Sequence, residues 1–246
     1  MPRNESSSKG EDRIRVAVLG SGQVGKSALA VRYLTKRFIG EYRSDSDMVY
    51  KCTLQISGSS QLVEIMDTCN CNDSDDFGAT EQQVNWGEAF IVVYSVTDKN
   101  SFRWAQDTVQ ELSLKRPQSQ VMLLGNKSDL DHHREVEEVD ARTLALTYGA
   151  RFREISVAES CEEVTKAMDG FLKEVKATHM SVGTGNGTGK PSSPKLRKLS
   201  VSRMLTQLIG RHSPPPHPIT EMIILDNQDR SKLSRQHLLI HCSAQI

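Results

Sequence analysis

No apolar run in the sequence approaches the roughly 18 residues that a membrane-spanning helix requires. Cysteine is scarce, with five residues among 246, and the odd number does not suit a framework of paired disulfide bonds. The N-terminal region has no targeting segment, position 2 is not glycine, and Cys242 lies one residue too far from the end for prenylation. We therefore expect a cytoplasmic protein in a reducing compartment, without a lipid anchor.

Charge of one sign is also not in excess, since basic and acidic residues number 31 each, but its distribution is uneven. Residues 179–246 hold nine basic and three acidic residues, a net charge of +6, which leaves −6 on the rest. We expect a disordered N-terminus at residues 1–12, one ordered domain at residues 13–178, and a basic, Gly/Ser/Pro-rich, largely disordered tail at residues 179–246. We expect a monomer with no nucleic-acid partner, whose tail makes at most weak electrostatic contact with a membrane.

Residues 20–27 match the phosphate-loop pattern Gly-x-x-x-x-Gly-Lys-Ser in full. The mostly apolar run at residues 14–19, which contains three β-branched residues, predicts a buried strand, and the apolar spacing of residues 27–34 predicts a helix. Glycines let backbone N–H groups turn toward an anion, and the helix N-terminus adds the positive end of its dipole. Lys26 would reach the terminal phosphates, and Ser27 would offer its hydroxyl to Mg²⁺. The predicted phosphate-site residues are Gly20, Ser21, Gly22, Gln23, Val24, Gly25, Lys26, Ser27 and Ala28.

Strands alternate with helices along the remainder of the domain. A hairpin is expected at residues 50–66, followed by strands at 89–96, 121–125 and 152–157 and helices at 101–115, 139–148 and 161–177, with irregular connections at 35–48 and 67–87. This order predicts an α/β fold with a doubly wound, mostly parallel six-stranded sheet and one antiparallel edge. Ligands of such sheets lie beyond the carboxyl ends of the strands, where the phosphate loop, Asp67 and Asn126 are expected to meet.

Residues 126–129, Asn-Lys-Ser-Asp, follow directly on the fifth predicted strand. The Asp129 carboxylate can accept two hydrogen bonds from guanine N1 and N2, whereas adenine presents no such pair of donors. Asn126 would tie this segment to the phosphate loop, and the stem of Lys127 would lie on the base. In an ATP-dependent enzyme, residues 126–129 would have no role in recognising the base. We therefore expect a guanine nucleotide.

Together these motifs make residues 13–177 resemble the Ras superfamily of small GTP-binding proteins. Residues 32–39 and 85–88 look most like the branch named after the Ras-related oestrogen-regulated growth inhibitor. The resemblance implies a signalling GTPase with GTP or GDP and Mg²⁺ as ligands, the metal held by Ser27 and by Asp67 through water. It also implies base stacking by Phe38, cover over the phosphates by Tyr42, and contact of the guanine oxygen with the backbone of Ser156, Val157 and Ala158.

Three residues depart from the pattern of that family beside the phosphates. Asp45 stands in place of a threonine that engages the metal, Asn70 in place of a glycine, and Cys71 in place of the glutamine that orients the attacking water. Cysteine is a weak donor and a weak acceptor, so we assign no catalytic residue and expect slow hydrolysis. Two readings stay open: a slow small monomeric GTPase, and a guanine-nucleotide-binding pseudo-GTPase or scaffold. In both, unknown effector or regulator proteins are expected to bind the loops at 42–50 and 67–87.

Overall fold

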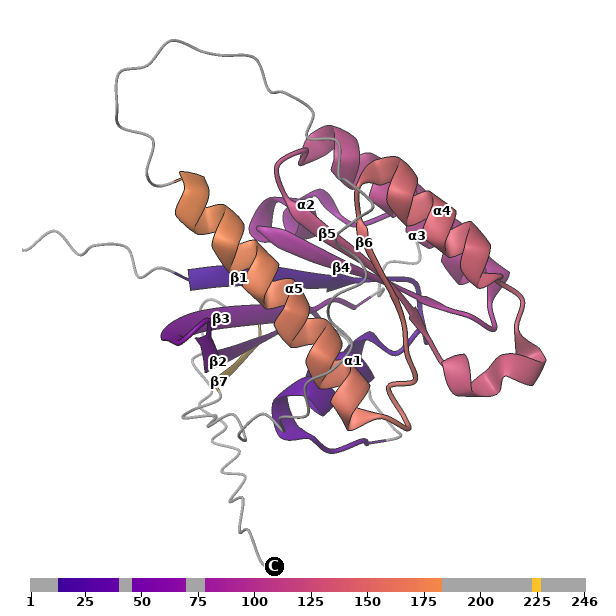
Figure 1. The fold of residues 1–246 in the computed structure, drawn as a ribbon, viewed down its shortest axis with the longest axis horizontal. Helices are drawn as coiled ribbons and strands as arrows, with labels where there is room; N and C mark the ends of the chain where they lie inside the picture. Colours follow the sequence, from indigo (N-terminus) through magenta and orange to yellow (C-terminus); the bar gives the residue numbers. More distant parts are fainter. Residues whose placement is uncertain (1–12, 40–45, 70–77, 183–222, 227–246) are drawn as a thin grey trace, which may run out of the picture.

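The computed structural model describes residues 13–39, 46–69, 78–182 and 223–226, which form one mixed sheet with helices on both faces (Figure 1). The strands follow the order β6-β5-β4-β1-β3-β2-β7 across the sheet. β1 pairs in parallel with β3 and β4, and β4-β5-β6 continue in parallel, whereas β2 pairs antiparallel with both β3 and β7. The expected doubly wound α/β fold is therefore confirmed.

The six expected strands are all present and are joined by a seventh. Their bounds are β1 Arg13–Leu19, β2 Met48–Ile56, β3 Ser59–Asp67, β4 Ala89–Ser95, β5 Gln120–Asn126, β6 Arg151–Glu154 and β7 Ile223–Asp226. The helices are α1 Lys26–Thr35, α2 Glu81–Trp86, α3 Lys99–Lys115, α4 Glu138–Tyr148 and α5 Cys161–Val182, with a 3-10 helix η1 at Ser128–His133. None of these helices is both long enough and apolar enough to traverse a lipid bilayer.

Two apolar clusters cover the two faces of the sheet. Val16 and Val18 of β1 pack with Leu29 of α1 and Phe171 of α5 on one face. On the other face, Leu19 packs in the cluster that contains side chains of α2, α3 and α4. Because both faces are covered, β4 is buried along its whole length, as a near-continuous apolar run predicts.

The β2–β3 hairpin is attached to α5 at its turn. Lys176 is buried on α5, and its Nζ donates to Ile56 O at 3.0 Å and to the Ser59 hydroxyl. The turn itself is formed by Ser57 and Gly58, both of which have positive φ. The turn end of the hairpin is thus fixed to α5. This end lies opposite the carboxyl ends of the parallel strands.

The structure corrects the expected elements in four places. The supposedly irregular residues 67–87 contain α2, because Thr80 and Gln83 cap each other reciprocally and start a helix there. β6 ends at Glu154 rather than at 157: Ile155 N still donates to Gly125 O of β5, but Val157 N donates to the Asn126 side chain instead of to a strand. α5 continues to Val182, and β7 arises from the tail. The N-terminal residues 1–12 and the remainder of the tail lie outside the described residues.

Candidate functional site

A cavity of about 550 Å³ lies where β1, β3 and β5 end. Twelve of the predicted site residues line it: Gly22, Gln23, Gly25, Lys26, Ser27, Ala28, Phe38, Asn126, Lys127, Asp129, Val157 and Ala158. Ile39, Thr68, Cys69 and Leu130 line it as well and were not predicted. Gly20, Ser21, Val24, Asp67 and Ser156 are not part of the lining, and Tyr42 lies outside the described residues.

The loop between β1 and α1 requires glycine at two positions. Gly20 has φ +156°, and a Cβ there would lie 2.5 Å from Val93 O on β4. Gly25 has φ +99°, and a Cβ there would lie 2.3 Å from Asn126 Nδ2. Gly25 also caps α1 without a side-chain hydrogen bond, so the first N–H groups of the helix remain available to an anion at the cavity.

Lys26 lies over the carbonyl groups of the same loop. Its Nζ donates to Gly20 O at 2.9 Å and to Ser21 O at 2.8 Å, and the side chain is largely buried. These contacts hold an ammonium group beside the helix N-terminus, and both features attract negative charge.

Asn126 joins three loops at the cavity. Its Nδ2 donates to Val24 O at 2.8 Å, which makes the expected link to the loop before α1. Its Oδ1 accepts from Lys127 N at 2.8 Å and from Val157 N at 3.0 Å. One buried amide therefore fixes the relative positions of the phosphate loop, the 126–129 segment and the loop after β6.

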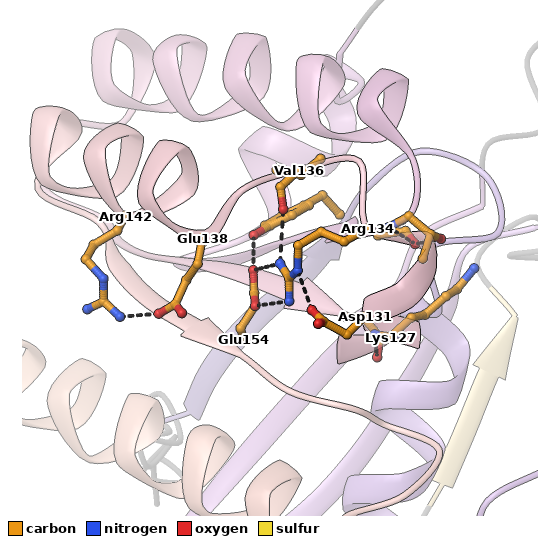
Figure 2. Close-up of polar contacts among 11 residues, drawn as sticks. Lys127, Asp131, Arg134, Val136, Glu138, Arg142 and Glu154 are labelled. Atoms are coloured by element: carbon orange, nitrogen blue, oxygen red, sulfur yellow. Dashed lines mark hydrogen bonds and ion pairs between the residues drawn. The ribbon is translucent and has the colours of Figure 1, made fainter. Parts of the chain in front are cut away.

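The 126–129 segment is further supported by a polar network that the sequence did not reveal (Figure 2). The Arg134 guanidinium donates to both carboxylate oxygens of Glu154 on β6, at 3.0 and 2.9 Å, and to Asp131 at 2.8 Å. Tyr94 on β4 donates to the same Glu154 at 3.1 Å. Hydrogen bonds to Glu154 and Asp131 raise the pKa of Arg134, and burial raises the pKa of Tyr94. The network attaches η1, which carries Asp129, to the middle of the sheet.

Phe38 lies at the mouth of the cavity and is 44% exposed. The guanidinium carbon of Arg32 lies 5.9 Å from its ring centroid. An exposed aromatic ring beside a cavity lined by Lys127 and Asp129 offers a flat apolar surface next to hydrogen-bonding groups, which suits a heteroaromatic base.

Asp67 ends β3 beside Ser27 and is buried to 2% exposure. Its Oδ1 has no hydrogen-bond partner among the described residues. Burial raises the pKa of Asp67 to about 6, while the Ser27 hydroxyl and the Lys26 ammonium oppose that rise. A buried carboxylate oxygen with no partner, next to a serine hydroxyl, is the set of oxygen ligands that a magnesium ion prefers.

A second carboxylate, Asp47, links the two loops at the other side of the site. Its Oδ1 accepts from Cys69 N at 2.8 Å, and both of its oxygens accept from Gln83 Nε2 at 3.2 Å. The residue before β2 is thereby joined to the loop after β3 and to α2. This link was also not predicted, and the departures Asp45, Asn70 and Cys71 lie outside the described residues.

Comparison with known proteins supports this geometry. Residues 15–177 match the Ras family model. Human Ras-like protein family member 11A is 35% identical over 196 residues, covering 76% of this chain and 81% of that protein. The bovine Ras-related and estrogen-regulated growth inhibitor-like protein is 35% identical over 190 residues, covering 74% and 93%. The human Ras-related and estrogen-regulated growth inhibitor is 34% identical over 197 residues, covering 79% and 96%.

The family model spans most of the described domain, and the relatives extend over about three quarters of the chain. The matched region contains the loop before α1 and the 126–129 segment, which the structure gathers at one cavity, together with Asp67, which lies beside Ser27. The expected resemblance is thereby confirmed, and the chain belongs to the Ras family of small GTPases.

Proposed function

We propose that this protein binds GTP and GDP together with Mg²⁺ in the 550 Å³ cavity and hydrolyses GTP slowly. The observation that carries the proposal is that one side chain, Asn126, joins the loop before α1 to the 126–129 segment and to the loop after β6. Phosphate-binding and base-binding residues are thereby held at the two ends of one cavity.

Each end of the cavity has a role in this proposal. The N–H groups at the start of α1 and the Lys26 ammonium bind the phosphates, and the Asp129 carboxylate accepts hydrogen bonds from guanine N1 and N2. The ring of Phe38 and the stem of Lys127 lie against the base, and the backbone at 156–158 receives the guanine oxygen. Tyr42 covers the phosphates.

Ser27 and Asp67 are the residues that would hold Mg²⁺, and the partnerless Oδ1 of Asp67 supports that assignment. When bound, the ion neutralises negative charge on the phosphate oxygens. The protein's own contribution is to orient the nucleotide and to keep the phosphates next to Lys26 and the helix N-terminus. Ser27 and Asp67 offer two oxygen ligands, and Mg²⁺ in nucleotide sites takes its other ligands from phosphate oxygens and water.

Hydrolysis is slow in this proposal because three residues near the γ-phosphate are replaced. Asp45 would repel the triphosphate, Asn70 occupies a position at which the family uses glycine, and Cys71 cannot orient water as glutamine does. The second candidate, a guanine-nucleotide-binding pseudo-GTPase or scaffold, is favoured by the same three residues. The two candidates share the nucleotide site and differ only in turnover.

The first experiment identifies the nucleotide retained on the purified full chain and compares GTP with ATP in competition. Lys26→Ala should abolish binding, and Asp129→Asn should weaken GTP while tolerating a xanthine nucleotide, whose carbonyl suits an amide donor. Equal affinity of the native protein for ATP and GTP would contradict the base assignment.

A single-turnover hydrolysis trace separates the two candidate functions. We expect a rate on the order of 10⁻⁴ per second or lower, which is the unassisted rate of Ras itself. Cys71→Gln should restore little, because Asp45 and Asn70 still disturb the γ-phosphate. A complete absence of turnover would favour the pseudo-GTPase, and a large rescue by Cys71→Gln would show that the other two replacements matter little.

The remaining features belong to the same proposal. The protein acts in signalling as a cytoplasmic monomer, and effector or regulator proteins bind the loops at 42–50 and 67–87. Asp47 supports the proposal that both loops belong to one partner-binding surface, because it is hydrogen bonded to Cys69 N and to Gln83 in the other loop.

A further inference from the structure

The last turn of α1 is fixed to α5, which lies beside it on one face of the sheet (Figure 1). Tyr33 is buried, and its hydroxyl donates to Asp169 Oδ1 on α5 at 2.8 Å. Lys36 follows directly on the helix, and its Nζ donates to the Thr165 hydroxyl at 3.1 Å. These contacts hold the end of α1, from which the chain continues to Phe38.

The chain folds back over this turn once α1 has ended. Lys36 has φ +61°, in the left-handed region, and its N–H donates to Arg32 O at 2.9 Å. The N–H of Arg37 donates to the Thr35 hydroxyl at 3.2 Å. The Phe38 ring is thereby brought back to the side chain of Arg32.

Arg32 contacts the Phe38 ring from outside the cavity. Its guanidinium carbon lies over the ring, 5.9 Å from the centroid, and Phe38 lines the cavity whereas Arg32 does not. Nη2 of the same guanidinium donates to Glu159 O at 3.4 Å, directly after the backbone at 156–158. Its Nε is buried and has no hydrogen-bond partner among the described residues. One side chain thus connects the ring expected at the base with the loop expected at the guanine oxygen.

A cation over an aromatic ring restricts the positions that the ring can take. A guanidinium is attracted to the ring electrons and can lie on the ring while it still donates a hydrogen bond elsewhere. Phe38 is 44% exposed, and an exposed side chain loses rotamer freedom when it packs against a ligand. A ring that is already held in place loses less, so the ligand binds more tightly.

We propose that Arg32 is a positioning residue that holds the Phe38 ring against the bound base and thereby slows the release of guanine nucleotide. The inference rests on the proposed function, since it requires a base in the cavity. Arg32 acts at the base end of the cavity, so its effect is the same for a nucleoside diphosphate and for a triphosphate.

The test measures how fast the full chain releases GDP that carries a fluorescent N-methylanthraniloyl group, with Mg²⁺ and excess unlabelled GDP present. The variants are Arg32→Met, which keeps an apolar stem without the guanidinium, Phe38→Leu, and the two combined. Arg37→Met is the matched control, because Arg37 is exposed and its loss removes a positive charge from the same segment. Arg32→Lys keeps the charge without the planar fork, and it replaces Arg32→Met if that variant does not fold.

Arg32→Met should release labelled GDP on the order of threefold to tenfold faster than the unsubstituted protein. A labelled, non-hydrolysable GTP analogue should be released faster by the same factor, and Arg37→Met should release both at the unsubstituted rate. Phe38→Leu should speed release on the order of tenfold or more. Adding Arg32→Met to Phe38→Leu should change the rate by less than about twofold, because both residues act through one contact.

Equal release from Arg32→Met and from the unsubstituted protein would overturn the inference. An effect of Arg32→Met that persists in full in the Phe38→Leu background would overturn it too, since Arg32 would then act without the ring. If the unsubstituted protein binds no labelled GDP, the proposed function fails and the inference fails with it. The two kinds of failure are distinguishable, because only the second leaves no release to measure.

Discussion

At the scale of single residues, Asp67 combines a cost in stability with its proposed role as a magnesium ligand. Its pKa is raised from 3.8 to about 6, so the folded protein holds this proton more tightly than the unfolded chain does. The contribution of Asp67 to the free energy of unfolding is therefore fully favourable only below about pH 4. As the pH rises through 6, this stabilising contribution falls by at most about 3 kcal/mol.

We therefore expect Asp67→Asn to stabilise the nucleotide-free, magnesium-free protein at pH 7.5 by about 1 to 2 kcal/mol in chemical denaturation, with a smaller gain at pH 5. The same variant should weaken magnesium-dependent nucleotide binding, because the neutral amide is a poorer ligand. Asp107→Asn on the exposed surface of α3 is the control and should change neither property. If Asp67→Asn instead destabilises the protein at pH 7.5, the carboxylate gains more free energy from its hydrogen bonds and charge contacts than it loses by burial.

Gly25 is constrained by both its backbone and its neighbour. Gly25→Ala places a Cβ at 2.3 Å from Asn126 Nδ2 at a residue with φ +99°. We expect loss of nucleotide retention and a decrease in the free energy of unfolding of about 2 kcal/mol or more, because the Asn126 side chain must move away from Val24 and Val157. Thermal denaturation and the bound-nucleotide content measure both effects.

The stability control is Gly22→Ala in the same loop, where an added Cβ meets nothing within 4 Å and φ is not in the left-handed region. The Gly22→Ala variant should have the same melting temperature as the unsubstituted protein. If both alanine variants are equally destabilised, the contact with Asn126 is not the reason that position 25 is glycine.

At the scale of elements, η1 depends on the network around Arg134 (Figure 2). Glu154→Gln removes the charge partner of a guanidinium whose side chain is only 17% exposed. Breaking one partner of such a pair should lower the free energy of unfolding by about 2 to 4 kcal/mol. It should also speed guanine-nucleotide dissociation, since η1 carries Asp129.

Arg142→Met is the matched control, because it breaks the exposed ion pair with Glu138 on α4 and keeps an apolar chain near Phe152. We expect a change below about 1 kcal/mol in stability and none in the dissociation rate. If the Glu154→Gln variant is destabilised but releases nucleotide at the native rate, the network stabilises the fold without controlling nucleotide release.

The elements also show where sequence patterns stop being informative. Periodicity and composition predicted the six strands and four of the helices because those signals are local. The capping residues Thr80 and Gln83 are a local signal for α2 that was available in the sequence, but the helix has only six residues and almost no apolar face. β7 forms only by pairing with β2 from far along the chain, and no local pattern fixes such a partner.

The candidate site follows the same division. The motif residues at 20–27 and 126–129 were predicted because their chemistry is encoded in consecutive positions, and the link from Asn126 to Val24 was expected. The contacts of Asp47 with Gln83 and of Arg134 with Glu154 join residues distant in sequence, so their types alone gave no indication. Tyr42 and the replaced switch residues stay predictions.

At the scale of the whole molecule, the charge is separated between residues 1–178, with a net charge of −6, and a tail of +6. Basic residues at Lys195, Arg197, Lys198 and Arg203 surround Ser200 in that tail, outside the described residues. Each basic residue near an anionic membrane contributes about 1 kcal/mol, so the attraction should be measurable but weak. A phosphate on Ser200 adds close to two negative charges and opposes it.

We expect the full chain to sediment with anionic liposomes at low salt and Ser200→Glu to sediment less, with Ser200→Ala as the control that keeps the native level. Neutral liposomes should bind none of the three. If the native chain fails to sediment with anionic liposomes, or if Ser200→Glu sediments like the native chain, the tail is a solvated linker without this membrane role.

The contact of Lys176 with the turn of the β2–β3 hairpin has a mechanical consequence for the whole molecule. The turn is held by α5, and β3 is paired with β1 as far as Asp67, so the hairpin is braced at both of its ends. It behaves as a beam supported at two points rather than as a free arm. A shift of the loops beside the cavity should therefore be absorbed at the start of β2 and should leave the turn and α5 in place.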